Sequence, residues 1–127
     1  MMFLGLGLRK EASLGAFLTL YRQLSLPPAL PIAISAHLEA HAVLPELAAM
    51  GHEVRTFPLA DLAQARCLTQ SPRILALHGV GSLAEAAAWW RAQTACLAGQ
   101  YPILKRPRQV SSCRSITLAI AHIGDPS

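Results

Sequence analysis

Short apolar runs alternate with longer stretches of helical periodicity, and this alternation is the strongest constraint on what the chain can fold into. The apolar runs, each long enough for a β-strand, are residues 3–8, 32–35, 54–57, 74–77, 103–106 and 116–123. Between them, apolar residues recur at helical spacing over 13–24, 39–50, 59–66 and 82–98. Such an alternation is typical of α/β folds. We therefore predict a three-layer α/β/α sandwich with a mostly parallel or mixed sheet of about five strands.

The composition indicates one compact domain over residues 1–127. Hydrophobic residues make up 53% of the chain and charged residues 14%, which excludes intrinsic disorder because disordered chains are poor in apolar residues and rich in charge. The longest uncharged run, residues 23–38, contains three prolines and is shorter than the roughly 20 residues of a membrane-spanning helix. A secretory signal has positive charges before its apolar segment, whereas Arg9 and Lys10 follow it here. We expect a cytoplasmic protein with no membrane partner.

The cysteines and histidines fit neither a disulfide scaffold nor a metal site. Cys67, Cys96 and Cys113 are odd in number and form no C-x-x-C pair, so a disulfide scaffold and a zinc ribbon are both excluded by spacing. His37 and His41 would share one face of a helix, but a metal site needs a third ligand that we cannot identify in the sequence. We therefore expect no metal ion and no cofactor.

The positive charge is concentrated in two places. The chain has 11 Lys and Arg against 7 Asp and Glu, a net charge of +4, which favours anionic partners in general. Arg9 and Lys10 form one group, and Lys105, Arg106, Arg108 and Arg114 form the other. Because there is no long basic tail, we expect no nucleic-acid partner.

Two glycine-containing motifs are candidates for ligand binding. Gly5 and Gly7 are similar to the start of a dinucleotide fingerprint, but its third glycine would fall at Lys10. The alternatives are a tight strand-to-helix turn, or a carboxylate-binding corner formed by the turn with Arg9 and Lys10.

The second motif is the strongest helix start in the chain. Ser82 and Glu85 form a capping box, in which the serine oxygen accepts the N–H of Glu85 and the glutamate reaches back to Ser82. Gly79 and Gly81 precede it and leave room for an anion to approach the positive end of the helix dipole. Trp89 and Trp90 lie farther along this helix, and one is expected to pack in the core and the other to cover the surface or an interface rather than to stack on a ligand.

Three stretches, taken in order, carry a family resemblance. Residues 5–9 read Gly-Leu-Gly-Leu-Arg, residues 79–87 read Gly-Val-Gly-Ser-Leu-Ala-Glu-Ala-Ala, and Leu104-Lys105 precedes Ile-Thr-Leu-Ala-Ile-Ala at 116–121. They resemble, respectively, the opening Gly-x-Gly-Cys-Arg, the Gly-Ser-Val-x-Glu-Ala-Ala signature, and the Val-Pro-Lys and final Thr-x-Ala-x-Ala of one cobalamin-biosynthesis family. This family comprises CobE and the C-terminal domain of CbiG.

The chain also departs from the family pattern. Leu8 stands where the family commonly has cysteine, so no thiol chemistry is assigned to that position. The family often has a lysine and a glutamate after its second strand, where this chain reads His37-Leu38-Glu39-Ala40. The N-terminal domain of CbiG has no counterpart in the sequence, so we expect a protein similar to the stand-alone CobE type.

The resemblance implies a role in building the corrin ring of vitamin B12, with a precorrin or corrinoid intermediate as ligand and other cobalamin-pathway enzymes as partners. CbiG-type proteins open a lactone on a cobalt-precorrin and expel a two-carbon fragment as acetaldehyde. Precorrins are apolar macrocycles fringed with carboxylates, which suit apolar walls and cationic or N–H donors. The residues that we expect to bind such a ligand are Gly5, Gly7, Arg9, Lys10, Gly81, Ser82 and Lys105.

Whether the protein is an enzyme is left open by the sequence. If it is, lactone hydrolysis or removal of a carbon fragment is the expected chemistry, with Ser82, Glu85 and His78 as candidate catalytic residues. No nucleophile–base pair is evident, so binding or escort of an intermediate ranks first. Two other classes remain as alternatives: a nucleotide- or dinucleotide-binding α/β enzyme, and a protein-interaction module that docks through Trp89 and Trp90.

Overall fold

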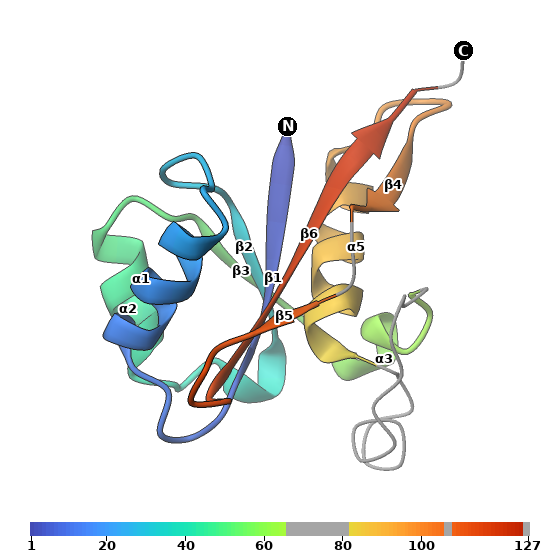
Figure 1. Cartoon of the computed structure of the whole chain (residues 1–127). Coiled ribbons are helices and arrows are strands. Elements are labelled where there is room, and N and C mark those ends of the chain that lie inside the picture. The colour runs from blue at the N-terminus through green and yellow to red at the C-terminus, as the bar shows by residue number, and fades with distance from the viewer. Residues whose placement is uncertain (66–81, 106–107, 126–127) are drawn as a thin grey trace.

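A computed structural model describes residues 1–65, 82–105 and 108–125, and these form a six-stranded sheet between two layers of helices (Figure 1). The predicted strand at 74–77 lies outside the described residues. The strands are β1 (Met2–Leu8), β2 (Ile32–Ser35), β3 (Val54–Phe57), β4 (Tyr101–Leu104), β5 (Gln109–Val110) and β6 (Ile116–Gly124). The helices are α1 (Leu14–Gln23), α2 (Val43–Ala49), α3 (Leu59–Leu62) and α5 (Leu83–Ala95), with a short 3-10 turn at Ala36–Leu38.

The sheet is mixed and has the strand order β3-β2-β1-β6-β4, with β5 also paired to β6. β1, β2 and β3 are parallel, whereas β6 is antiparallel to β1, β4 and β5. The predicted α/β sandwich is confirmed, and within the two options given for its sheet the mixed one holds. β6 is antiparallel to β5 because a short hairpin after Val110 turns the chain directly back. A parallel return would require a long crossover connection.

The two faces of the sheet are covered by different helices. In Figure 1, α1 and α2 lie on one side of β1 and β6, and α5 and α3 on the other. The α1–α2 side holds the larger core, in which side chains such as Phe17, Leu47 and Leu118 pack together. On the other side, Ala84, Ala88 and other alanines of α5 pack directly on β1 and β6. Small residues therefore let α5 approach the sheet closely.

Local capping explains where the helices begin and end. The predicted N-cap of α1 is confirmed, since the Ser13 Oγ accepts the N–H of Ala16 at 3.2 Å. The predicted left-handed Gly51 after α2 is also confirmed, with φ +96°. The helix expected at 39–50 begins only at Val43, whose N–H donates to the Nδ1 of His41 at 3.1 Å. Gly99, expected to end α5, lies beyond its C-cap residue, Cys96.

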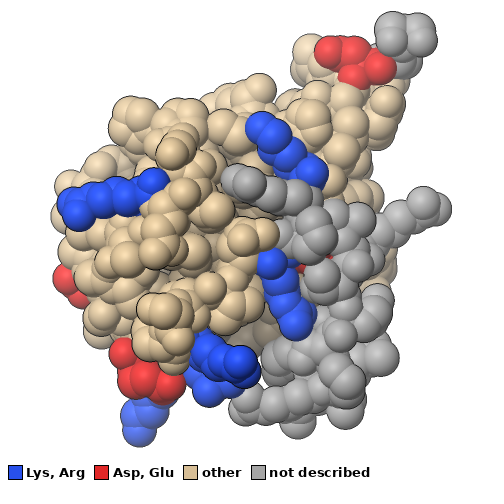
Figure 2. Space-filling model, viewed as in Figure 1, with Lys and Arg blue, Asp and Glu red and all other residues tan. Residues whose placement is uncertain are grey.

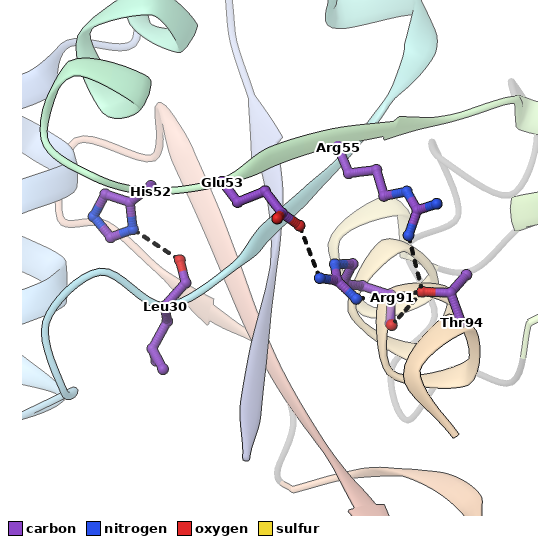
Figure 3. Close-up of polar contacts among 6 residues, drawn as sticks. All are labelled: Leu30, His52, Glu53, Arg55, Arg91 and Thr94. Carbon is purple, nitrogen blue, oxygen red and sulfur yellow. Dashed lines mark hydrogen bonds and ion pairs between the residues drawn. The ribbon is translucent and has the colours of Figure 1, made fainter. Parts of the chain in front are cut away.

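Polar contacts attach the edge strand β3 to α5 (Figure 3). Arg91 of α5 donates to the carboxylate of Glu53 at 2.8 Å and lies over the ring of Phe3, 4.9 Å from its centroid. Arg55 of β3 donates to the Thr94 Oγ1 at 3.4 Å. These contacts lie at the amino end of the parallel strands and leave the carboxyl end open.

The described helices are too short and not apolar enough for any of them to cross a membrane.

Candidate functional site

A pocket of about 1070 Å³ opens at the carboxyl end of β1. Its walls are the loop after β1, the turn after β2, the first turn of α5, and the β5–β6 hairpin. Its lining includes Gly7, Arg9, Lys10, Ser82, Arg108 and Arg114. Open α/β sheets generally bind ligands beyond the carboxyl ends of their parallel strands, so the topology favours this end as a site.

The lining of the pocket is strongly cationic. Arg9, Lys10, Arg108 and Arg114 contribute four positive charges, and Glu11 is the acidic residue among the described lining side chains. Figure 2 shows Lys and Arg side chains grouped on the lower part of this face, where the surface is hollowed. Arg9 and Lys10 of the first basic group and Arg108 and Arg114 of the second, about 100 residues apart along the chain, thus meet around one pocket. Such a lining attracts a ligand that carries several negative charges.

The backbone around Arg9 is held from both sides. Its N–H donates to the carbonyl of Ser115 in the hairpin at 2.9 Å. Its carbonyl accepts from the Nε2 of His41 at 2.9 Å, and the Nδ1 of the same ring accepts the N–H of Val43. His41 is therefore a structural residue that ties the loop after β1 to the start of α2. This arrangement fixes where the Arg9 side chain leaves the backbone.

The start of α5 forms the opposite wall. The Ser82 Oγ accepts the N–H of Glu85 at 3.3 Å, which confirms the predicted capping role of Ser82. Ser82 is 2% exposed and Glu85 is fully buried. One carboxylate oxygen of Glu85, Oε2, accepts the backbone N–H of Arg108 at 3.2 Å. Glu85 therefore links α5 to the segment before β5 and places Arg108 at the pocket.

Replacing Glu85 by alanine is expected to lower the free energy of unfolding by about 3 kcal/mol, because the N–H of Arg108 loses its acceptor and a cavity is left. Glu85→Gln keeps an acceptor oxygen of the same size and is expected to cost only about 1 kcal/mol. Urea denaturation of the three proteins measures the difference. Equal stability of Glu85→Ala and the wild type would contradict the structural role.

The β5–β6 hairpin carries the thiol of Cys113. Its Sγ lies 2.9 Å from the Ser115 Oγ and 3.5 Å from the Ser111 Oγ. Hydrogen bonds from Ser115 first, and from Ser111 second, lower the pKa of the Cys113 thiol to about 7. Burial, in contrast, raises the pKa of the Cys96 thiol.

Cys113 is therefore expected to react with iodoacetamide at pH 7 well before Cys96, since the thiolate is the nucleophile. The reaction rate should rise through pH about 7 and level off above it, as the lowered pKa predicts. Mass spectrometry of peptides after timed alkylation measures both rates. A Cys113 rate that is still rising steeply at pH 9 would contradict the lowered pKa.

The predicted site residues are only partly brought together. Gly7, Arg9, Lys10 and Ser82 line the pocket, whereas Gly81 and the candidate catalytic His78 lie outside the described residues. Gly5 lies in the middle of β1, buried under α5. The strand predicted at residues 3–8 is confirmed, and the alternative of a strand-to-helix turn at Gly5 and Gly7 is wrong, because both glycines lie within β1.

Lys105 also lies away from the pocket. Leu104 pairs with Ala121, which in turn pairs with Phe3 near the amino end of β1. The Lys105 Nζ accordingly lies 3.8 Å from the Sδ of Met2. Glu85 does not line the pocket either, as it is buried behind its wall.

Most of the lining residues are not predicted as site residues by the sequence, among them Arg108, Arg114 and His37. The two arginines belong to the second basic group, which was the available signal. The Nδ1 of His37 lies 2.6 Å from the Oγ of Ser35, a fully buried residue. Across the part of the chain that the structure describes, no cluster of three His, Cys, Asp or Glu side chains could hold a metal ion.

The two tryptophans pack against each other, whereas the sequence predicts that one of them is buried in the core. Their rings meet edge to face, with centroids 5.2 Å apart. The indole N–H of Trp90 donates to the carbonyl of Asp61, which attaches α3 to α5. Both rings are half-buried, so neither is a fully exposed docking residue.

Comparison with known proteins identifies similar sequences and folds. A family model described as "Cobalamin synthesis G C-terminus" matches residues 2–121. The crystal structure of CobE, described as a protein from the cobalamin (vitamin B12) biosynthetic pathway, superposes with a TM-score of 0.81 at 21% identity and covers 100% of this chain and 93% of CobE. Cobalamin biosynthesis protein chiG from Agrobacterium tumefaciens str. C58 superposes with a TM-score of 0.66 at 25% identity, over 98% and 100% of the two chains. Among curated protein sequences there is no significant match.

Proposed function

The chain belongs to the cobalamin synthesis G C-terminus family and is a protein of cobalamin biosynthesis, and from this premise we propose that its cationic pocket binds a precorrin-type tetrapyrrole. The observation that carries the proposal is the convergence of Arg9, Lys10, Arg108 and Arg114 on one pocket at the carboxyl end of the parallel strands. Cations spaced around a hollow suit a ligand whose carboxylates are spaced around a ring.

The size and the walls of the pocket support the same ligand class. Small-molecule pockets generally occupy roughly 300–1,000 Å³, so a pocket of about 1070 Å³ is suited to a large ligand. Leu8, Leu38, Leu83 and Val110 supply apolar lining in addition to the cations. Apolar walls pack against a macrocycle, and arginine guanidinium groups bind carboxylates in pairs of parallel hydrogen bonds.

The polar groups at the pocket favour binding or escort over catalysis. The Ser82 hydroxyl caps α5 and is almost fully buried, and the Glu85 carboxylate lies behind the wall. Ser35 and His37 form a hydroxyl–imidazole pair, but Ser35 is fully buried, so its oxygen is out of reach of a ligand. If a fragment-removing reaction does take place, the arginines would stabilise the negative charge that develops on the reacting oxygen.

The positions of Gly5 and Gly7 argue against the nucleotide-binding alternative. A dinucleotide fingerprint places its glycines in a turn whose N–H groups face a phosphate. Here Gly5 is paired with Ala33 on one side and Ala119 on the other, so its backbone belongs to the sheet.

The test is a titration of the purified protein with hydrogenobyrinic acid, followed by visible absorbance and by calorimetry. We expect a dissociation constant on the order of micromolar. Hydrogenobyrinic acid with its carboxylates converted to amides should bind at least about tenfold more weakly, because each arginine loses its charged partner. Binding of ATP or NAD in preference to the tetrapyrrole would replace the proposal with the nucleotide alternative, and binding of none of them would overturn it.

A further inference from the structure

The tip of the β5–β6 hairpin has an unusual backbone conformation. Arg114 has φ +60°, in the left-handed region. An L-residue with a side chain is unfavourable there because its Cβ approaches the following carbonyl oxygen, and glycine usually occupies such positions in hairpin loops. The N–H of Arg114 donates to the carbonyl of Ser111 at 2.9 Å, which closes the turn.

Side chains within the hairpin hold this conformation in place. The Ser111 Oγ accepts the N–H of Ile116 at 3.1 Å and lies 3.5 Å from the Cys113 Sγ. The same sulfur lies 2.9 Å from the Ser115 Oγ. Ser111 and Ser115 are both buried, and the Ser115 carbonyl accepts the N–H of Arg9. The turn is thus fixed both internally and against the loop after β1.

Arg114 also lines the cationic pocket. Strained residues persist when the surrounding structure fixes them, and they are concentrated at functional sites. We propose that Arg114 is a ligand-binding and specificity-determining residue: the hairpin keeps it in a left-handed conformation, at a cost in stability, to hold a guanidinium at the pocket for one peripheral carboxylate of the ligand. This inference rests on the proposed tetrapyrrole function and adds to it the residue that distinguishes a carboxylate from an amide.

The test is Arg114→Gly, which removes the strain and the charge together. We expect the melting temperature to rise by about 3 °C, because relief of the strain exceeds the added flexibility of the unfolded chain. We expect hydrogenobyrinic acid to bind about tenfold more weakly, as for the loss of one charged hydrogen-bonded pair. The preference of the wild type for the carboxylate form over the amidated form should shrink in the same variant.

Two further variants separate strain from charge. Ser25 has φ +51° in the loop between α1 and β2 and is not among the residues lining the pocket, so Ser25→Gly should raise the melting temperature and leave binding unchanged. Arg114→Lys retains the charge and the strain, and it should keep the wild-type melting temperature and most of the affinity.

The possible failures can be told apart. If the wild type does not bind hydrogenobyrinic acid, the proposed function and this inference fail together. If the wild type binds and Arg114→Gly binds equally well with the same preference for carboxylates, the inference alone is overturned. A lower melting temperature for Arg114→Gly would show that the left-handed backbone carries no strain, and would likewise overturn it.

Discussion

Gly5→Ala is expected to lower the free energy of unfolding by at least about 3 kcal/mol, a large part of the stability of a domain of this size. A Cβ at this position would lie 1.9 Å from the carbonyl oxygen of Ala84 and 2.5 Å from the backbone nitrogen of Ala88. Both are backbone atoms of α5, which cannot move aside as a flexible side chain can. The whole helix would have to move away from the sheet and open the alanine-rich core beneath it.

The matched control is Gly7→Ala, two residues along the same strand. A Cβ there would meet the Cβ of Thr117 at 3.6 Å, an ordinary van der Waals distance. This variant is therefore expected to stay within about 1 kcal/mol of the wild type. Urea denaturation followed by circular dichroism measures both variants, and similar midpoints for the two would contradict the close approach of α5 to β1.

The double variant Arg9→Ala with Arg108→Ala is expected to weaken binding of hydrogenobyrinic acid about 100-fold. Each lost pair of a guanidinium and a carboxylate is expected to cost about tenfold, which corresponds to roughly 1.4 kcal/mol. The fold should persist, because these structural hydrogen bonds involve backbone atoms that alanine keeps. The backbone of Arg9 bonds to Ser115 and His41, and the backbone N–H of Arg108 donates to Glu85.

Lys105→Ala is the control for this experiment, since it removes one positive charge away from the pocket. It should change the affinity less than about twofold, as expected for a screened charge beyond the contact region. The wild-type affinity should also fall as salt is added, and the dependence on salt should be weaker in the double variant. If Lys105→Ala and the double variant lose affinity equally, the ligand is attracted by net charge alone and the pocket is not its site.

The sequence is sufficient to predict most of the fold, because its elements are marked by local signals. Ser13, Gly51 and Ser82 are cap residues that act within one turn of their own positions, and all three are where the sequence predicts them. β5 was not predicted, since it has only two residues and no periodicity can be recognised over so short a run. The orientation of β6 depends on that hairpin, so the arrangement of the sheet could not be derived from the sequence alone.

The site was harder to predict, because which residues meet at the pocket depends on the register of the paired strands and on how α5 packs on them. Arg9 and Ser82 follow recognisable motifs and do line the pocket. Gly5 matches a ligand-binding motif as well, but it is required by the approach of α5, a contact that the local sequence does not reveal. Lys105 also follows a strand, but the end of β4 is in register with Phe3, near the amino end of β1. It is not in register with Leu8, at the carboxyl end where the pocket lies. The position of a residue along its own strand can be predicted from the sequence, but the register in which neighbouring strands pair cannot.

The most direct test of the central claim, that this cationic pocket holds the tetrapyrrole, is to map where hydrogenobyrinic acid binds by amide chemical-shift changes in the ¹⁵N-labelled protein. The amides of Gly7, Ser82, Ser111 and Thr117, which all line the pocket, should shift most. The amide signals of residues around Glu53, at the opposite end of the sheet, should not shift. Shifts concentrated around Glu53 or Lys105, with the pocket amides unchanged, would contradict the account.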